Sequence, residues 1–220
     1  RDGVAALARG TARIGAALLH VSTDYVFDGT KAGEWVEEDA TNPLGAYGAS
    51  KLAGEAAALN ANPRTLILRT SWLYSPWGRN FVTTMLSLAD RERLTVVDDQ
   101  LGKPTSAHDL AEAIVTIAPR LATLPTGSPL WGVYHYAGRG TTSWAGFARE
   151  TFAQATGKLV QQVPEIVPIP ASDYPTAAPR PANSALDCTA FEHDFGIKMV
   201  DWRSALARVI DQIAQMRLVA

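Results

Sequence analysis

Apolar residues along this chain occur either in short continuous runs or at helical spacing. The short runs predict strands, and they lie at residues 16–21, 65–70, 94–97 and 132–138. Segments with helical spacing predict helices at residues 1–15, 45–60, 80–92, 106–121, 143–156 and 201–216. Strands that are apolar throughout and alternate with helices are typical of a parallel sheet covered on both faces. We therefore expect an α/β fold with a doubly wound parallel sheet.

One long segment departs from this alternation. Residues 157–200 are rich in proline, as in "PEIVPIPASDYPTAAPRPANS". Proline fixes the backbone and favours turns and extended structure. We expect this segment to form loop-rich structure wrapped on the main body.

Composition narrows the classes of function. The chain has 220 residues, 47% of them hydrophobic and 19% charged, with a net charge of -2. This charge balance lacks the excess of basic residues that is typical of proteins that bind nucleic acid or a membrane surface. The longest apolar runs are too short to span a bilayer. Cys188 is the one cysteine and cannot form an intrachain disulfide, which favours a reducing compartment, the cytoplasm.

The histidines do not indicate a metal site. The chain has four of them, and none has the spacing of zinc ligands. We expect them to be structural, and we expect no metal centre from protein side chains. They lie at His20, His108, His135 and His193.

Polar residues follow the first predicted strand directly. Ser22, Thr23 and Asp24 stand at its carboxyl end, where ligands bind in open α/β sheets. The next predicted helix carries Tyr47 and Lys51, which are four residues apart and share one helix face. A helix that follows the strand can bring Tyr47 over Thr23.

Such a trio has a specific chemistry. A free tyrosine titrates near ~10, and a lysine ammonium beside it favours the phenolate and lowers that value. Tyr47 could then protonate a carbonyl oxygen during a reduction, with Thr23 bonded to the same oxygen. Taken singly, Tyr47 is more simply a half-buried helix aromatic and Lys51 a solvated side chain. The spacing alone leaves both interpretations open.

Several motifs, in order, carry a resemblance to a known family. "VSTDYVFDG", "YGASK", "RTSWLY", "DDQLGKPTSAHDLA" and "RPANSALD" together resemble the dTDP-4-dehydrorhamnose reductases, which are extended short-chain dehydrogenase/reductases. The resemblance covers nearly the whole chain. It implies NADPH- or NADH-dependent reduction of the 4-keto group of dTDP-4-dehydrorhamnose, which gives dTDP-L-rhamnose. It implies a nucleotide-sugar partner and allows a homodimer, and it leaves a magnesium requirement open.

The resemblance also implies roles for single residues. Thr23, Tyr47 and Lys51 would be the catalytic triad, and these three with Ser22 would contact the cofactor. Lys51 would reach the ribose hydroxyls, and Arg180 would meet a diphosphate. The residues implied in binding the nucleotide sugar are Asp24, Trp72, Asn80, Gln100, Gly102, Thr105, Arg180 and Asn183.

The domain organisation that follows has two parts. Residues 1–130 would be the later portion of an NAD(P)-binding Rossmann-like domain, and residues 131–220 mainly a substrate-binding part, with segments exchanging between them.

The family's glycine-rich phosphate loop precedes the stretch that matches residue 1, and the Gly138-x-Gly140 turn does not meet that fingerprint. We therefore expect these 220 residues alone to bind NAD(P)H weakly, to lack reductase activity, and to cover an unpaired sheet edge against another chain.

Two other functions compete. A nucleotide-sugar epimerase or dehydratase would use the same triad, but dehydratases usually carry an acidic pair after the threonine, whereas Tyr25 follows Asp24 here. A non-catalytic regulatory homologue is the third possibility, and the intact triad argues against it.

Overall fold

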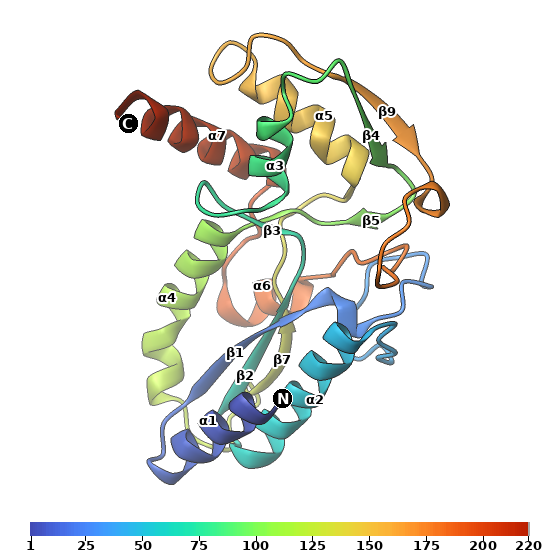
Figure 1. Ribbon diagram of the computed structural model, residues 1–220. Helices are drawn as coiled ribbons and strands as arrows, with labels where there is room; N and C mark the ends of the chain where they lie inside the picture. Colours follow the sequence, from blue (N-terminus) through green and yellow to red (C-terminus); the bar gives the residue numbers. More distant parts are fainter. Residues whose placement is uncertain (220) are drawn as a thin grey trace. The chain divides into compact units, whose positions relative to one another are not determined.

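A computed structural model describes residues 1–219 and shows alternating strands and helices (Figure 1). The helices and strands in chain order are α1 (Asp2–Arg13), β1 (Leu18–Thr23), the 3-10 helix η1 (Asp24–Val26), α2 (Ala46–Ala61), β2 (Thr65–Thr70), β3 (Leu73–Tyr74), α3 (Phe81–Ser87), β4 (Arg93–Val97), β5 (Leu101–Gly102), β6 (Thr105–Ser106), α4 (Ala107–Thr123), β7 (Gly132–His135), β8 (Thr142–Ser143), α5 (Trp144–Ala155), β9 (Glu165–Ile169), the 3-10 helix η2 (Ala171–Asp173), α6 (Thr189–Phe195) and α7 (Trp202–Val219).

Most predicted elements are confirmed, and the differences have local causes. The strand predicted at 16–21 begins at Leu18, because Gly15 adopts a left-handed backbone (φ 66°) that ends the α1 turn. The helix predicted at 80–92 ends at Ser87, since residues 90–93 are exposed and offer no apolar face to bury. The proline-rich segment contains a helix that was not predicted, α6, which ends at the left-handed Gly196. Within residues 1–219, no helix combines the length and apolar character needed to cross a membrane.

The chain divides into two compact units, each built from three segments. Unit 1 comprises residues 1–71, 111–137 and 178–199, and unit 2 comprises residues 72–110, 138–177 and 200–220. The units interleave along the sequence. The assignment of cofactor and substrate roles to residues 1–130 and 131–220 stays a prediction.

Unit 1 is organised around a parallel sheet in the order β1-β2-β7, which confirms the expected fold class. The central strand β2 is buried along its whole length, as its apolar run predicts. Helices α1 and α2 pack together with the sheet through Ala8, Ala58 and Ile67. In the described residues β1 forms one edge of this sheet, and the pairing of that edge with another chain stays a prediction.

Unit 2 has a separate core made mainly by three helices. Residues from α3, α5 and α7 form one buried cluster that contains Phe147, Phe152, Trp202 and Leu206. Short strand pairs border it: β3 with β6, β4 with β9 and, antiparallel, β5 with β8. Tyr74 on β3 extends this core, and its hydroxyl donates a hydrogen bond to the Trp202 carbonyl at 3.2 Å.

Candidate active site

The end of β1 closes into a tight, capped turn in unit 1. Thr23 Oγ1 donates to Asp24 Oδ1 at 2.9 Å and accepts the Tyr25 N–H at 3.2 Å, which caps η1. Thr23 and Asp24 are both buried. The side chains that the sequence places at a strand end are therefore held there by local hydrogen bonds.

Helix α2 lies against this turn at a position that only glycine fits. A Cβ on Gly48 would stand 2.1 Å from the Tyr25 carbonyl oxygen. The neighbouring Tyr47 ring meets the Tyr25 ring edge-on, with centroids 6.1 Å apart. Tyr47 is 59% exposed, so a ligand can reach its side chain.

Lys51 lies on the same face of α2 and bonds to β1 itself. Its Nζ donates to the Val21 carbonyl at 2.6 Å, two residues before Thr23. Burial lowers the pKa of Lys51, and the nearby Glu55 carboxylate partly offsets that effect. The structure therefore brings Tyr47 and Lys51 alongside the end of β1, as their spacing predicts.

Asp24 is a buried carboxyl group with spare hydrogen-bonding capacity. Its Oδ2 has no partner among the described residues, while Ser184 and Thr23 bond to the group. Burial raises the pKa of Asp24 from 3.8 to about 7, and these hydrogen bonds only partly oppose that effect. The sequence did not indicate Ser184, because it stands 160 residues from Asp24 in the chain.

The other site residues predicted in unit 1 have different surroundings. Arg180 is exposed, and its positive charge acts on the hydroxyl of Tyr25. Asn183 uses its polar atoms within the fold, since Nδ2 donates to the carbonyls of Lys31 and Gly33 at 2.8 Å and Oδ1 accepts the Ala185 N–H. Substrate contacts by Arg180 and Asn183 stay predictions.

Ser22 also points away from solvent. It is buried, and its Oγ donates a hydrogen bond to Glu55 Oε1 on α2. Its hydroxyl is therefore bonded within the fold, and a cofactor contact by Ser22 stays a prediction.

In unit 2, Trp72 has a strained backbone and a stacked side chain. Its φ of 48° is the positive value that non-glycine residues rarely adopt. Its ring stacks on Trp144 with centroids 3.5 Å apart and planes 6° from parallel. A Cβ on Gly102 would lie 2.4 Å from Trp72 Cε2, so Gly102 supports the indole. A strained backbone that the surrounding packing keeps in place, as at Trp72, is common at ligand-binding sites.

The remaining predicted residues of unit 2 are structurally engaged or buried. Asn80 caps α3 by accepting the Thr83 N–H, and its Nδ2 donates to the Ser75 carbonyl. Thr105 Oγ1 accepts the Gly138 N–H at 3.2 Å and donates to the Lys103 carbonyl. Gln100 is buried. Binding roles for these residues stay predictions.

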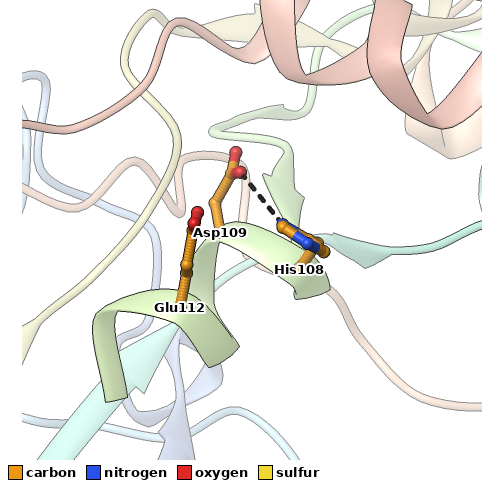
Figure 2. A group of neighbouring side chains, drawn as sticks. All are labelled: His108, Asp109 and Glu112. Carbon is orange, nitrogen blue, oxygen red and sulfur yellow. Dashed lines mark ion pairs between the residues drawn. The ribbon is translucent and has the colours of Figure 1, made fainter. Parts of the chain in front are cut away.

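One cluster of possible metal ligands was not predicted. Figure 2 shows His108, Asp109 and Glu112 on the first turns of α4, with ligand atoms within 4.8 Å of one another. The Asp109 carboxylate is also ion-paired with Arg208 at 2.5 Å, which satisfies part of its charge. The spacing typical of zinc ligands does not indicate this cluster, because its members are nearly adjacent on one helix.

Comparison with known proteins gives a consistent result. The profile of the RmlD substrate binding domain matches residues 1–215. The dTDP-4-dehydrorhamnose reductase of Sinorhizobium fredii is 47% identical over 214 residues, which are 96% of this chain and 71% of that protein. This chain belongs to the dTDP-4-dehydrorhamnose reductase family.

Solved structures of the dTDP-4-dehydrorhamnose reductase family agree with the fold. The Clostridium acetobutylicum reductase superposes with a TM-score of 0.86 at 36% identity, and the Bacillus anthracis reductase, solved in complex with NADP, with a TM-score of 0.85 at 33% identity. Each match covers 96% of this chain and 71% of the solved chain. The family resemblance noted in the sequence is thereby confirmed.

Proposed function

We propose that this chain carries the catalytic residues of a dTDP-4-dehydrorhamnose reductase, which converts dTDP-4-dehydrorhamnose to dTDP-L-rhamnose with NADPH or NADH. The observation that carries the proposal is the placement of Tyr47 and Lys51 against the end of β1, where Thr23 stands. Family membership supplies the substrate, and NADP in the Bacillus anthracis relative supports the cofactor class.

The residues present fit a nicotinamide cofactor at this place. Lys51 Nζ has one hydrogen-bond acceptor among the described residues, the Val21 carbonyl, and an ammonium offers three donors. The remaining N–H groups can bind ribose hydroxyls. When bound, the reduced nicotinamide supplies the hydride for the sugar carbonyl carbon.

Proton transfer is the task of Tyr47. Its exposed hydroxyl would donate a proton to the carbonyl oxygen as that oxygen gains negative charge. The Lys51 ammonium on the same helix face would stabilise the charge left on the tyrosine oxygen. Thr23 would hydrogen-bond the carbonyl oxygen and orient it.

Binding of the sugar is assigned to other groups. Asp24 offers a buried carboxyl with one oxygen lacking a partner, which suits a sugar hydroxyl. Within unit 2, the Trp72 indole supplies an apolar face and an N–H donor of the kind that sugars bind.

The test is net reduction by a full-length protein that contains this chain, because the chain matches 71% of the Sinorhizobium fredii reductase. NADPH and dTDP-4-dehydrorhamnose are mixed with it, the loss of NADPH absorbance is followed, and the product is identified by NMR. Equimolar NADPH consumption and dTDP-L-rhamnose formation are expected. An epimerase would change the sugar without net NADPH loss, and a regulatory homologue would do neither.

A further inference from the structure

Glu55 is a buried carboxylate on the catalytic face of α2. It follows Lys51 by four residues and Tyr47 by eight, so the three side chains lie along one side of the helix. Glu55 is only 2% exposed, and carboxylates are rarely buried to this degree unless they are paired. The hydrogen-bond partners of Glu55 therefore indicate its role in the fold.

The Glu55 carboxylate binds both strands that lie beneath α2. Oε2 accepts from Arg69 Nη2 at 2.8 Å, and Oε1 accepts from Arg69 Nε at 3.1 Å and from Ser22 Oγ. Ser22 on β1 and Arg69 on β2 are register partners in the parallel sheet. One carboxylate thus connects α2 to two neighbouring strands at the same level.

This connection acts next to the catalytic residues. Glu55 receives the hydrogen bond of Ser22, and Lys51 donates to the Val21 carbonyl, so consecutive β1 residues are bonded to consecutive turns of α2. Thr23 is the next residue of the strand. A slide of the helix by one residue, about 1.5 Å, would break both connections.

The charges around Glu55 come from three strands and α2. Arg69 on β2 pairs with it, and the Arg69 guanidinium lies 5.2 Å from the Phe27 ring centroid. Burial lowers the pKa of Lys51 on α2 and of His20 on β1, and the Glu55 charge opposes this in both. Burial, followed by the positive charge of Arg69, lowers the pKa of His135 on β7 to about 3. Glu55 is thus the acid that balances Arg69 and supports the positive charge of Lys51.

We infer that Glu55 is a positioning residue for the reduction: through Ser22 and Arg69 it fixes α2 on the end of β1, and so holds Tyr47 and Lys51 in register with Thr23. The inference rests on the proposed function for its kinetic consequence. Its structural consequence, the placement and charge of Lys51, can be measured without any substrate.

The main variant is Glu55→Leu combined with Arg69→Met in the intact protein. Replacing both members of a buried ion pair by apolar residues of similar size often preserves stability, whereas removing one member leaves an unpaired charge. Glu55→Gln and Ser22→Ala are the companion variants, each of which removes part of the connection. Glu38→Gln is the matched control, since Glu38 is exposed in the same unit.

Two readouts separate positioning from simple stability. The first is kcat and KM with NADPH and dTDP-4-dehydrorhamnose, together with circular dichroism and Tm. The second is the rate at which acetic anhydride labels Lys51 across a pH series, measured by peptide mass spectrometry with the exposed Lys198 as internal reference. The labelling readout needs neither cofactor nor sugar.

The expected result for the double variant is a folded protein with kcat lower by up to about 10²-fold and KM changed little, because small misplacements of catalytic groups have effects of that size. Lys51 should be labelled faster, and the midpoint of its labelling against pH should fall, since the carboxylate that raises the pKa of Lys51 is gone. Glu55→Gln should shift both readouts in the same direction. Ser22→Ala keeps the carboxylate and should lower kcat alone, and Glu38→Gln should change neither readout.

A folded double variant with wild-type kcat and wild-type Lys51 labelling would overturn the inference. If the double variant does not fold, Glu55→Gln decides by the same two readouts and Ser22→Ala by kcat. If the wild-type protein reduces no keto sugar, the proposed function has failed. Lys51 labelling then still decides: a shift in the variants supports the positioning role, and no shift rejects it.

Discussion

Two regions of this protein hold candidate functional side chains in opposite ways. In unit 1, the region formed by Ser22, Lys51, Glu55 and Arg69 is held by charged, directional hydrogen bonds on regular strand and helix backbone. In unit 2, Trp72 is held by ring stacking on Trp144 and has a strained backbone. We call these the charged region and the aromatic region.

The difference matches the role that we propose for each region. Proton transfer requires the donor and acceptor to be placed within a fraction of an ångström, and charged hydrogen bonds have strict geometry. An aromatic face for a sugar tolerates small shifts, so packing is sufficient. The positive φ of Trp72 costs on the order of 1–3 kcal/mol, and a stacked aromatic pair returns about 0.5–1.5 kcal/mol beyond its buried area.

The comparison is tested most strongly by removing the proposed proton donor, Tyr47, which lies on α2 beside the charged region. Tyr47→Phe keeps the ring and its contact with Tyr25 but deletes the hydroxyl. Because general acid catalysis is worth ~10²–10⁴-fold, kcat should fall by about that factor with Tm unchanged. Steady-state kinetics and thermal unfolding check this, and a variant with near wild-type kcat would remove Tyr47 from the mechanism.

The close approach of α2 to the turn at Tyr25, beside the charged region, predicts the next largest effect. Gly48→Ala would place a Cβ 2.1 Å from the Tyr25 carbonyl oxygen, so the helix must move. We expect the free energy of unfolding to fall by about 1–3 kcal/mol and kcat to fall with it. Gly10→Ala on α1 is the matched control: its Cβ meets no atom within 4 Å, so alanine should stabilise by up to about 1 kcal/mol. Equal denaturation curves for the two variants would show that α2 tolerates the extra atom.

The aromatic region should respond in binding rather than in rate. Gly102→Ala pushes a Cβ into the Trp72 indole and displaces it. If the displaced indole loses about 1.4 kcal/mol of binding free energy for the sugar, the KM for the keto sugar should rise roughly tenfold while the KM for NADPH stays constant. Gly127→Ala, whose Cβ would be free of contacts within 4 Å, serves as control. A rise in the NADPH KM alone would mean that Trp72 does not serve the sugar.

The remaining prediction is a pH-dependent change in stability at Asp24, which needs no substrate. Burial raises the pKa of Asp24 to about 7 from its ordinary 3.8, so the native state favours the protonated form. This contribution is complete below about pH 4 and is lost as the pH rises through about 7. Asp24→Asn should therefore match the wild-type Tm near pH 4 and exceed it by several degrees near pH 8. An equal Tm difference at both pH values would show that Asp24 does not titrate in this range.

The sequence predicts the regular parts of both regions well. Continuous apolar runs and helical spacing locate the strands of unit 1 and most helices, and the four-residue interval locates Tyr47 with Lys51 on one face. The family motifs indicate Thr23 and Trp72 as well. These features depend on local periodicity, which a single chain displays directly.

The long-range partners are not visible in the sequence. Gly48 is needed because a carbonyl 23 residues earlier approaches it, and Ser184 reaches Asp24 from a distant loop. One signal was available: Arg69 interrupts the apolar run of β2, and a charged residue inside a buried strand requires a buried acid such as Glu55. Conversely, the polar side chain of Asn183, expected at the substrate, is bonded within the fold, which only the contacts reveal.

The central claim, that Tyr47 protonates the oxygen while a hydride reaches the carbonyl carbon, is tested most directly by isotope transfer. The intact protein is given NADPH deuterated at nicotinamide C4 together with dTDP-4-dehydrorhamnose, and the product is examined by NMR. The account predicts dTDP-L-rhamnose with one deuterium at C4, formed at a rate that Tyr47→Phe lowers by ~10²–10⁴-fold. A product without deuterium at C4, or equal rates for the two proteins, would contradict it.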